Sequence, residues 1–288
     1  MSGKNIFITG SRGMLGSGMS DFLKCGNILE CSEDFDITDI NSVYKELGLY
    51  DIDVIIHAAA YTDVDGCEIE PDTAYKVNTI GTQNLVNYSM DKDILFIYVS
   101  STGIYGDEKK DTPYTEFDNV NPTTVHHRSK YEAEKIIQNH LSRFLILRTG
   151  WLYGGEREHK KNFVYKRYLE AMQNDTIYSD NSQIGNPTFV IDFIRQIEIL
   201  IEKGHYGIYN CVNKAENISR YDYVKKIIDF FEISVDVKAA PKGMFKRVAP
   251  VSKNESASNY KLELLGLNVM RPWEEALLSY VETLKSGI

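Results

Sequence analysis

The sequence of 288 residues contains only four cysteines, and no two of them form a Cys-x-x-Cys pair. Cys25, Cys31, Cys67 and Cys211 also lie far from the six histidines in any spacing that is typical of a zinc site. We therefore predict no metal site. We interpret the cysteines as reduced and mostly buried thiols.

The sequence also lacks a long hydrophobic run. No apolar stretch approaches the ~20 residues that a membrane-spanning helix needs. Residues 1–4 lead directly into an apolar segment, without the long apolar core that is typical of a signal peptide. We therefore expect a cytoplasmic protein that makes no use of a membrane.

The sequence has fewer basic than acidic residues: it contains 32 Lys and Arg and 41 Asp and Glu, which gives a net charge of -9. A broad nucleic-acid-binding face needs clustered Lys and Arg to offset phosphate charge. The composition therefore argues against nucleic acid as a partner. Any anionic ligand has to be bound by a few local groups.

The first half of the chain shows strand-length apolar runs that alternate with longer amphipathic segments. This alternation is the signature of βαβ units and a parallel sheet, which predicts an α/β fold. The expected strands are 5–9, 28–31, 54–57, 94–100 and 144–148, and the expected helices are 14–24, 41–48, 73–90 and 128–141.

A glycine-rich turn joins the first expected strand to the first helix. It reads Gly10-Ser11-Arg12-Gly13-Met14-Leu15-Gly16. Its glycines allow a tight turn and close approach of a pyrophosphate, which the helix N-terminus favours electrostatically. Glycines mark turns of every sort, but the position after strand one favours dinucleotide binding and a Rossmann-type, doubly wound sheet.

The second expected strand ends in an acidic segment, 30–34. A carboxylate there accepts hydrogen bonds from the ribose 2′-OH of NAD and repels a 2′-phosphate, which gives a slight preference for NADH over NADPH. Arg12 offers an alternative contact for the extra phosphate, and the carboxylates also fit a solvated surface. Asp36 and Ile37 follow at a place suited to the adenine edge.

Small side chains follow the third expected strand. Ala58, Ala59 and Ala60, with Tyr61 after them, allow a cofactor to lie against the backbone, although close helix packing explains them as well. Asn78 lies on an otherwise apolar helix face further along the chain. A buried amide needs hydrogen-bond partners, and bracing the backbone of a site is one use for it.

The stretch from 98 to 134 carries the residues for a carbonyl reduction. That reaction needs a proton donor, a second hydrogen bond to the oxygen and a positive charge. Ser101 and Thr102 at a strand end supply hydroxyl groups, and Val99 precedes them on the strand. Lys130 on the next helix supplies the charge and a contact for the nicotinamide ribose.

His126 occupies the position four residues before Lys130. An unperturbed imidazole titrates near pH 6.5 and is able to give a proton, but it is on the order of 2 Å shorter than a tyrosine phenol. Three interpretations stay open: direct or water-relayed catalysis, loss of the reaction, or a deliberately altered residue. We expect the adjacent His127 to be exposed.

The second half of the chain loses strict alternation. Residues 162–173, 190–203 and 273–285 are expected to be helical, and Ser219–Asp222 resembles a capping box that opens a further helix to about Phe231. Residues 241–258 suggest a long exposed loop. We expect a cofactor-binding domain at 1–155, completed by part of 188–212, and a smaller α/β substrate-binding portion at 156–288.

Several segments together resemble one family. They are the Gly10–Gly16 turn, 36–39, 58–65, 148–154, 162–164, 183–188 and 272–277. With these motifs the chain is similar to the dTDP-4-dehydrorhamnose reductase family of the extended short-chain dehydrogenases/reductases. The resemblance covers nearly the whole chain, and the segments at 151 and 183 together are its most specific part.

The resemblance implies an NAD(P)H-dependent reduction of the 4-keto group of a nucleotide-activated deoxysugar. As partners we expect the nucleotide sugar and a second copy of the chain in a homodimer. The resemblance also implies substrate contacts, which are Asp63, Val64, Asp65, Trp151, Asn162, Gln183 and Arg247. The sequence departs from the family pattern twice: His126 replaces the tyrosine proton donor, and Arg247-Val248 replaces an Arg-Pro pair.

These departures leave two alternatives. One is a catalytically impaired, cofactor-binding regulatory or partner subunit. The other is a nucleotide-sugar epimerase or dehydratase, which needs an additional base, and no Asp, Glu or Lys lies beside Thr102 to act as one.

Overall fold

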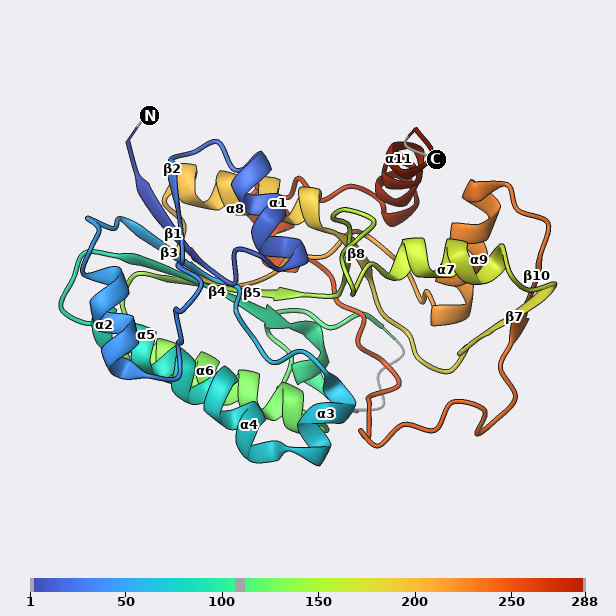
Figure 1. Cartoon of the computed structure of the whole chain (residues 1–288), viewed down its shortest axis with the longest axis horizontal. Coiled ribbons are helices and arrows are strands. Elements are labelled where there is room, and N and C mark those ends of the chain that lie inside the picture. Colours follow the sequence, from blue (N-terminus) through green and yellow to red (C-terminus); the bar gives the residue numbers. More distant parts are fainter. Residues whose placement is uncertain (1–2, 107–111, 287–288) are drawn as a thin grey trace.

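A parallel sheet forms the centre of the computed structural model, which describes residues 3–106 and 112–286 (Figure 1). Within those residues the sheet has six strands in the order β2-β1-β3-β4-β5-β9, and each pairs in parallel with its neighbours. Their bounds are β1 Asn5–Thr9, β2 Asn27–Glu30, β3 Val54–His57, β4 Leu95–Ser101, β5 Phe144–Thr149 and β9 Gly207–Asn210. The direction of winding reverses between β1 and β3, where open α/β sheets bind ligands.

Helices cover both faces of the sheet, as the predicted α/β fold requires (Figure 1). Ile6 and Ile8 of β1 join a core with α1 (Met14–Phe22) and α8 (Val190–Lys203), whereas Phe7 joins a second core on the opposite face. This second face carries α2 (Ile40–Leu47), α5 (Gly81–Ser89) and α6 (Val125–His140). The middle residues of β1, β3, β4 and β5 are apolar because both faces of the sheet are buried there.

The helix expected at 73–90 is divided into three parts. It begins as α4 (Pro71–Tyr75), passes through the π-helical segment η1 (Lys76–Ile80) and continues as α5. A π turn inside a helix adds one residue to the turn and frequently marks a functional site. The short helix α3 (Val64–Ile69), which we did not predict, precedes it, and Asp63 caps α3 by accepting a hydrogen bond from Gly66 N.

Several elements of the C-terminal half, among them α7 (Phe163–Ala171) and α9 (Arg220–Phe231), lie beyond the carboxyl ends of β4 and β5 (Figure 1). β6 (Trp151–Tyr153) pairs with β8 (Pro187–Phe189), and β7 (Thr176–Ser179) pairs with β10 (Asp236–Ala239). The other elements are η2 (Thr102–Tyr105), α10 (Tyr260–Leu264) and α11 (Trp273–Lys285). In the described parts of the chain, no helix is both long and apolar enough to cross a membrane.

The predicted capping box is confirmed at the start of α9. Ser219 Oγ accepts a hydrogen bond from Asp222 N at 3.1 Å, and Asp222 Oδ2 accepts one from Ser219 N at 3.0 Å. The prediction of an exposed loop at 241–258 is wrong for its second half. Ser252, Glu255 and Ser256 are buried there, because this segment folds back against Tyr114 and the turn around Ile184.

Candidate active site

A cavity of about 1160 Å³ lies at the carboxyl ends of the strands. This volume exceeds the roughly 300–1,000 Å³ that is typical of a site for one small ligand. Its walls come from the glycine turn, the ends of β3, β4 and β5, the start of α6, and loops of the C-terminal half. The cavity therefore has room for a dinucleotide and a second ligand side by side.

The glycine turn fits a pyrophosphate. Gly10 has φ +71°, and a Cβ there would lie 2.8 Å from Ala59 N; a Cβ on Gly16 would lie 2.1 Å from Gly10 O. Gly13 caps α1 without a side-chain hydrogen bond, so the first amides of the helix have no side-chain acceptor. Close backbone packing and uncapped amides at a helix N-terminus are the features that bind a dinucleotide phosphate.

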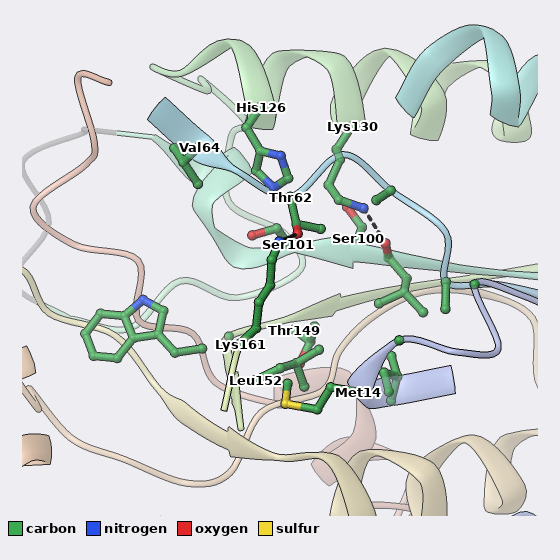
Figure 2. Close-up of a pocket in the computed structure, with 18 of the residues that line it drawn as sticks. Met14, Thr62, Val64, Ser100, Ser101, His126, Lys130, Thr149, Leu152 and Lys161 are labelled. Carbon is green, nitrogen blue, oxygen red and sulfur yellow. Dashed lines mark hydrogen bonds between the residues drawn. The ribbon is translucent and has the colours of Figure 1, made fainter. Parts of the chain in front are cut away.

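Lys130 is buried, with 6% of its surface exposed, and it reaches the sheet from α6 (Figure 2). Its Nζ donates a hydrogen bond of 2.7 Å to Val99 O and lies 4.8 Å from the centre of the Tyr98 ring. Burial lowers the pKa of Lys130 to about 8, although the carboxylate of Glu134 one turn along α6 acts in the opposite direction. The ammonium is thus poised between charged and neutral forms near physiological pH.

This pKa gives a first prediction. In a nuclear magnetic resonance titration of lysine side chains, the signal that disappears in Lys130→Met is expected to titrate near pH 8, below the usual 10.4 for lysine. The reason is that the folded protein disfavours the buried charge. A signal for Lys130 that titrates at pH 10 or above would contradict the burial described here.

A buried ion pair supports the floor of the site. Glu134 accepts hydrogen bonds from Arg148 Nη2 at 2.7 Å and Nε at 3.2 Å, and from Ser100 Oγ at 2.5 Å. Both charged side chains are almost completely buried. The pair connects α6, which carries Lys130, to β4 and β5, and so fixes the height of that helix above the strand ends.

The two hydroxyl residues at the end of β4 differ in position. Ser101 lines the cavity, and its Oγ accepts a hydrogen bond of 3.2 Å from Gly103 N, which leaves its proton free to donate. Thr102 is 1% exposed at the start of η2 and does not line the cavity. Ser101 is therefore the hydroxyl that is able to contact a ligand.

His126 lies one turn before Lys130 and points into the cavity (Figure 2). Its Nδ1 lies 3.1 Å from Tyr61 O, and a carbonyl oxygen only accepts, so Nδ1 carries a proton. Burial lowers the pKa of His126 well below its usual value, and the neighbouring His127 and Lys130 lower it further. The ring is therefore neutral at physiological pH, and its Nε2 is a hydrogen-bond acceptor.

His127 is buried, and the expectation that it is exposed is wrong. Only 5% of its surface is exposed, and a Cβ on Gly103 would lie 2.1 Å from its Cε1. Thr124 caps α6 by accepting from His127 N at 3.1 Å and also contacts His127 Nδ1 at 3.0 Å. The ring fills the space that glycine leaves in the turn after β4.

Asn78 in the π segment joins the loop after β3 to α6. Its Oδ1 accepts from Tyr61 N at 2.8 Å, and its Nδ2 donates to Tyr61 O at 3.2 Å and to Ser129 Oγ at 3.0 Å. Tyr61 O is also the partner of His126. The amide therefore holds the backbone group that sets the tautomer of His126.

Aromatic and charged side chains gather at the opposite end of the cavity. Arg220 lies over the Trp151 ring, with its Cζ 3.5 Å from the ring centre, and Trp151 Nε1 donates to Glu255 at 2.9 Å. Arg220 also donates to Gln183 at 3.5 Å. Burial lowers the pKa of Arg220 to about 10, which leaves it charged at neutral pH. A stacked ring beside a cation suits an anionic, ring-containing ligand.

Many of the predicted site residues line this cavity. They are Gly10, Arg12, Gly13, Met14, Leu15, Gly16, Ala58, Ala59, Ala60, Val64, Val99, Ser101, His126, Lys130, Trp151, Gln183 and Arg247. The structure brings them together from seven separate parts of the sequence, 10–16, 58–64, 99–101, 126–130, 151, 183 and 247.

Other predicted residues do not line the cavity. They are Ser11, Asp36, Ile37, Tyr61, Asp63, Asp65, Asn78, Thr102 and Asn162. Several have structural partners instead: Asp36 accepts from Thr38, Asp65 accepts from Ala249 N and pairs with Arg247 at 3.7 Å, and buried Asn162 caps α7 and donates to Tyr280.

Several residues that line the cavity were not predicted from the sequence. They include Thr62, His127, Thr149, Glu156, His159, Lys160, Lys161, Arg220, Val251 and Glu255. Lys161 precedes Asn162 and Arg220 lies inside the capping box, so both adjoin segments that the sequence singled out. Glu255 had no local signal, because only the folding back of a loop brings it to Trp151.

The comparisons with known proteins identify the relatives of this chain. The family model described as "RmlD substrate binding domain" matches residues 4–286. A dTDP-4-dehydrorhamnose reductase of Mycolicibacterium smegmatis is 29% identical over 280 residues, which cover 95% of this chain and 84% of the relative.

Two solved structures are similar over nearly the whole chain. A dTDP-4-dehydrorhamnose reductase from Clostridium acetobutylicum has a TM-score of 0.91 and 32% identity, and covers 98% of this chain and 99% of its own. The enzyme of the same name from Bacillus anthracis, in complex with NADP, has a TM-score of 0.92 and 30% identity with the same coverage.

Proposed function

Since this chain belongs to the RmlD substrate binding domain family, we propose that it is an NAD(P)H-dependent oxidoreductase that reduces the 4-keto group of a nucleotide-activated deoxysugar. The proposal rests chiefly on one observation: the glycine turn, Ser101 and Lys130 line the same cavity. The names of the relatives, which are reductases of a dTDP-linked keto sugar, support it.

The cofactor end of the cavity is the end that the glycine turn forms. The amides at the start of α1 hold the pyrophosphate, Ala58–Ala60 pack against the dinucleotide, and Lys130 donates to the nicotinamide ribose. When bound, the reduced nicotinamide supplies the hydride that adds to the carbonyl carbon. Ser101 donates a hydrogen bond to the carbonyl oxygen, and the Lys130 ammonium stabilises the negative charge that develops there.

The opposite end of the cavity takes the nucleotide sugar in this proposal. Trp151 and Gln183 contact the sugar or base, and Arg220 and Arg247 neutralise the diphosphate. We assign 1–155 with part of 188–212 to cofactor binding and most of 156–288 to substrate binding. The pairing of β9 with β5 supports this division, because it adds 207–210 to the first sheet.

We propose that NADH binds at least as well as NADPH. Arg12, the cation of the glycine turn, lies 3.6 Å from the exposed carboxylate of Glu33, which offsets its charge and repels a 2′-phosphate. Direct titration of the chain with both cofactors compares the two affinities. A preference for NADPH of tenfold or more would remove this part of the proposal.

A turnover assay tests the function itself. The protein is mixed with NADH or NADPH and a panel of nucleotide-linked 4-keto sugars, and cofactor oxidation is followed. The proposal expects oxidation with at least one sugar. Tight cofactor binding without oxidation at high protein concentration would instead favour a non-catalytic partner subunit, which His126 in the donor position keeps as the second candidate. A stable hetero-complex, captured from the native host, would support that candidate.

Replacing His126 by tyrosine is expected to raise kcat by about tenfold or more, the range of a well-placed acid. The neutral ring with its proton on Nδ1 has none to give on the cavity side, whereas a phenol at the same place does. His126→Phe is the matched control, since it fills the same space without a donor. A fall in kcat for His126→Tyr would show that His126 itself is a working proton donor.

A further inference from the structure

A second lysine reaches the same part of the cavity from the opposite side. Lys161 lies in the loop before α7, and its side chain crosses the cavity toward Thr62 and Ser101 (Figure 2). Its Nζ donates a hydrogen bond to Thr62 Oγ1. Although much of the residue is exposed, its charged end lies inside the cavity.

The charge of Lys161 acts on the groups around the proposed carbonyl position. Burial, then His127 and Lys130, lower the pKa of His126, and the charge of Lys161 acts in the same direction; burial raises the pKa of Cys67 to about 11, and the charge of Lys161 opposes that shift. In Figure 2 the side chain of Lys161 ends beside Thr62 and Ser101, below the ring of His126. Thr62, the only partner of its Nζ among the described residues, is a neutral hydroxyl, so no carboxylate holds the ammonium in place.

The other groups near the proposed carbonyl have other roles. His126 carries its proton on Nδ1, where Tyr61 O accepts it, and the Lys130 ammonium donates to Val99 O and, in the proposed function, to the nicotinamide ribose. The Ser101 hydroxyl is too weak an acid to be left as an alkoxide. The ammonium of Lys161 has three donor hydrogens, of which Thr62 uses one.

We propose that Lys161 is the proton donor of the reduction and takes the place of the tyrosine that His126 replaces. As hydride adds to carbon and the oxygen gains negative charge, one N–H bond of Lys161 breaks and an O–H bond forms on the sugar. The lysine is left as a neutral amine, and it recovers a proton from solvent at the open side of the cavity. This inference rests on the proposed function.

A different role for Lys161 is a contact with the diphosphate of the substrate. Removing the Lys161 side chain would change a different kinetic quantity in each role. A proton donor acts in the transition state, so its removal lowers kcat, whereas a phosphate contact acts in the ground state, so its removal weakens binding. Arg220 and Arg247 already supply cations at the other end of the cavity.

The experiment compares Lys161→Met and Lys161→Arg with the native chain, using NADH or NADPH and a nucleotide-linked 4-keto sugar that the native chain reduces. We expect kcat to fall by about 10² or more in both variants, because an arginine keeps the charge but holds its proton too tightly to give it up. The calorimetric affinity for the keto sugar without cofactor should change by less than about threefold. Lys166→Met is the control, since Lys166 is exposed on α7, outside the cavity, and its variant should match the native chain.

The double variant Lys161→Met with His126→Tyr gives a second readout. A phenol at 126 supplies the proton, so Lys161→Met should lower kcat by less than about threefold when position 126 is tyrosine, against about 10² or more when it is histidine. The loss of a phosphate contact would lower activity by the same factor in both backgrounds. The difference between the two factors therefore separates proton donation from binding.

Three results would overturn the inference: an unchanged kcat in Lys161→Met, full activity in Lys161→Arg, or a loss of affinity that accounts for the loss of turnover. Each of them leaves the proposed function intact, because the native chain still turns over in the same assay. A native chain that reduces no keto sugar would remove the proposed function and this inference together.

Discussion

Replacing Lys130 by methionine is expected to lower kcat/KM by about 10²–10³, the effect of removing one oriented charge from a developing oxyanion. In the proposed reaction Lys130 holds the ribose and supplies the positive charge beside Ser101, and among the described residues of α6 it is the only cation that lines the cavity. Methionine has a similar length and keeps the contact with the Tyr98 ring. Steady-state kinetics and direct cofactor titration measure the two parts of the loss.

The loss should not come from unfolding. The pKa of Lys130 is lowered to about 8, so below that pH the folded protein carries a charge that burial disfavours, and removing it relieves a cost. We expect a midpoint of thermal unfolding no lower than that of the native chain. Lys135→Met on the same helix is the control, since Lys135 is half-exposed, lies outside the cavity and contacts Glu132, at 2.6 Å, and the Tyr131 ring. Normal activity in Lys130→Met would contradict the proposed site.

Replacing Glu134 by glutamine is expected to destabilise the protein by about 3–5 kcal/mol. The substitution leaves Arg148 as a buried charge without its partner and weakens the hydrogen bond from Ser100. Urea unfolding measures the difference in free energy. Glu132→Gln, on the same helix but at an exposed ion pair, should change it by less than about 1 kcal/mol.

Removing both charges of the pair should lower the free energy of unfolding much less than removing one. A double variant with methionine at 134 and 148 should regain much of the stability that Glu134→Gln loses, because no unpaired charge stays in the core. A Glu134→Gln protein as stable as the native chain would show that the ion pair does not hold α6 on the sheet. The positioning of Lys130 would then need another explanation.

The strands and the glycine turn were predictable from the sequence because local patterns determine them. The apolar run of β3 has the same bounds in prediction and structure, and Gly10 and Gly16 lie where a side chain would collide with the backbone. Ser219 and Asp222 form their capping box within four residues. In each case the signal and the structure it produces lie in one short segment.

Features that depend on distant contacts were not predictable. The π turn at Asn78 has no local signature, since it arises from bonds to Tyr61 and Ser129. The burial of His127 depends on the glycine at 103. Trp151 and Glu255 meet across 104 residues of sequence, and nothing near Glu255 indicates it.

The identity of the proton donor shows the same limit. The spacing from Lys130 identified His126 as the residue in the donor position. Spacing alone does not show which ring nitrogen of His126 carries the proton. The hydrogen bond from His126 to Tyr61 O depends on the loop after β3, which Asn78 fixes. Lys161 was not predicted as a site residue, because only the folded chain brings the loop before α7 to Thr62.

The central claim, reduction of a sugar ketone by direct hydride transfer, is tested most directly with a cofactor that carries deuterium at the transferred position. The native chain is incubated with that cofactor and a nucleotide-linked 4-keto sugar, and the product is analysed by mass spectrometry and nuclear magnetic resonance. We expect one deuterium per product molecule, on the former carbonyl carbon. A bound cofactor with an unchanged sugar, or product without deuterium at that carbon, would contradict it.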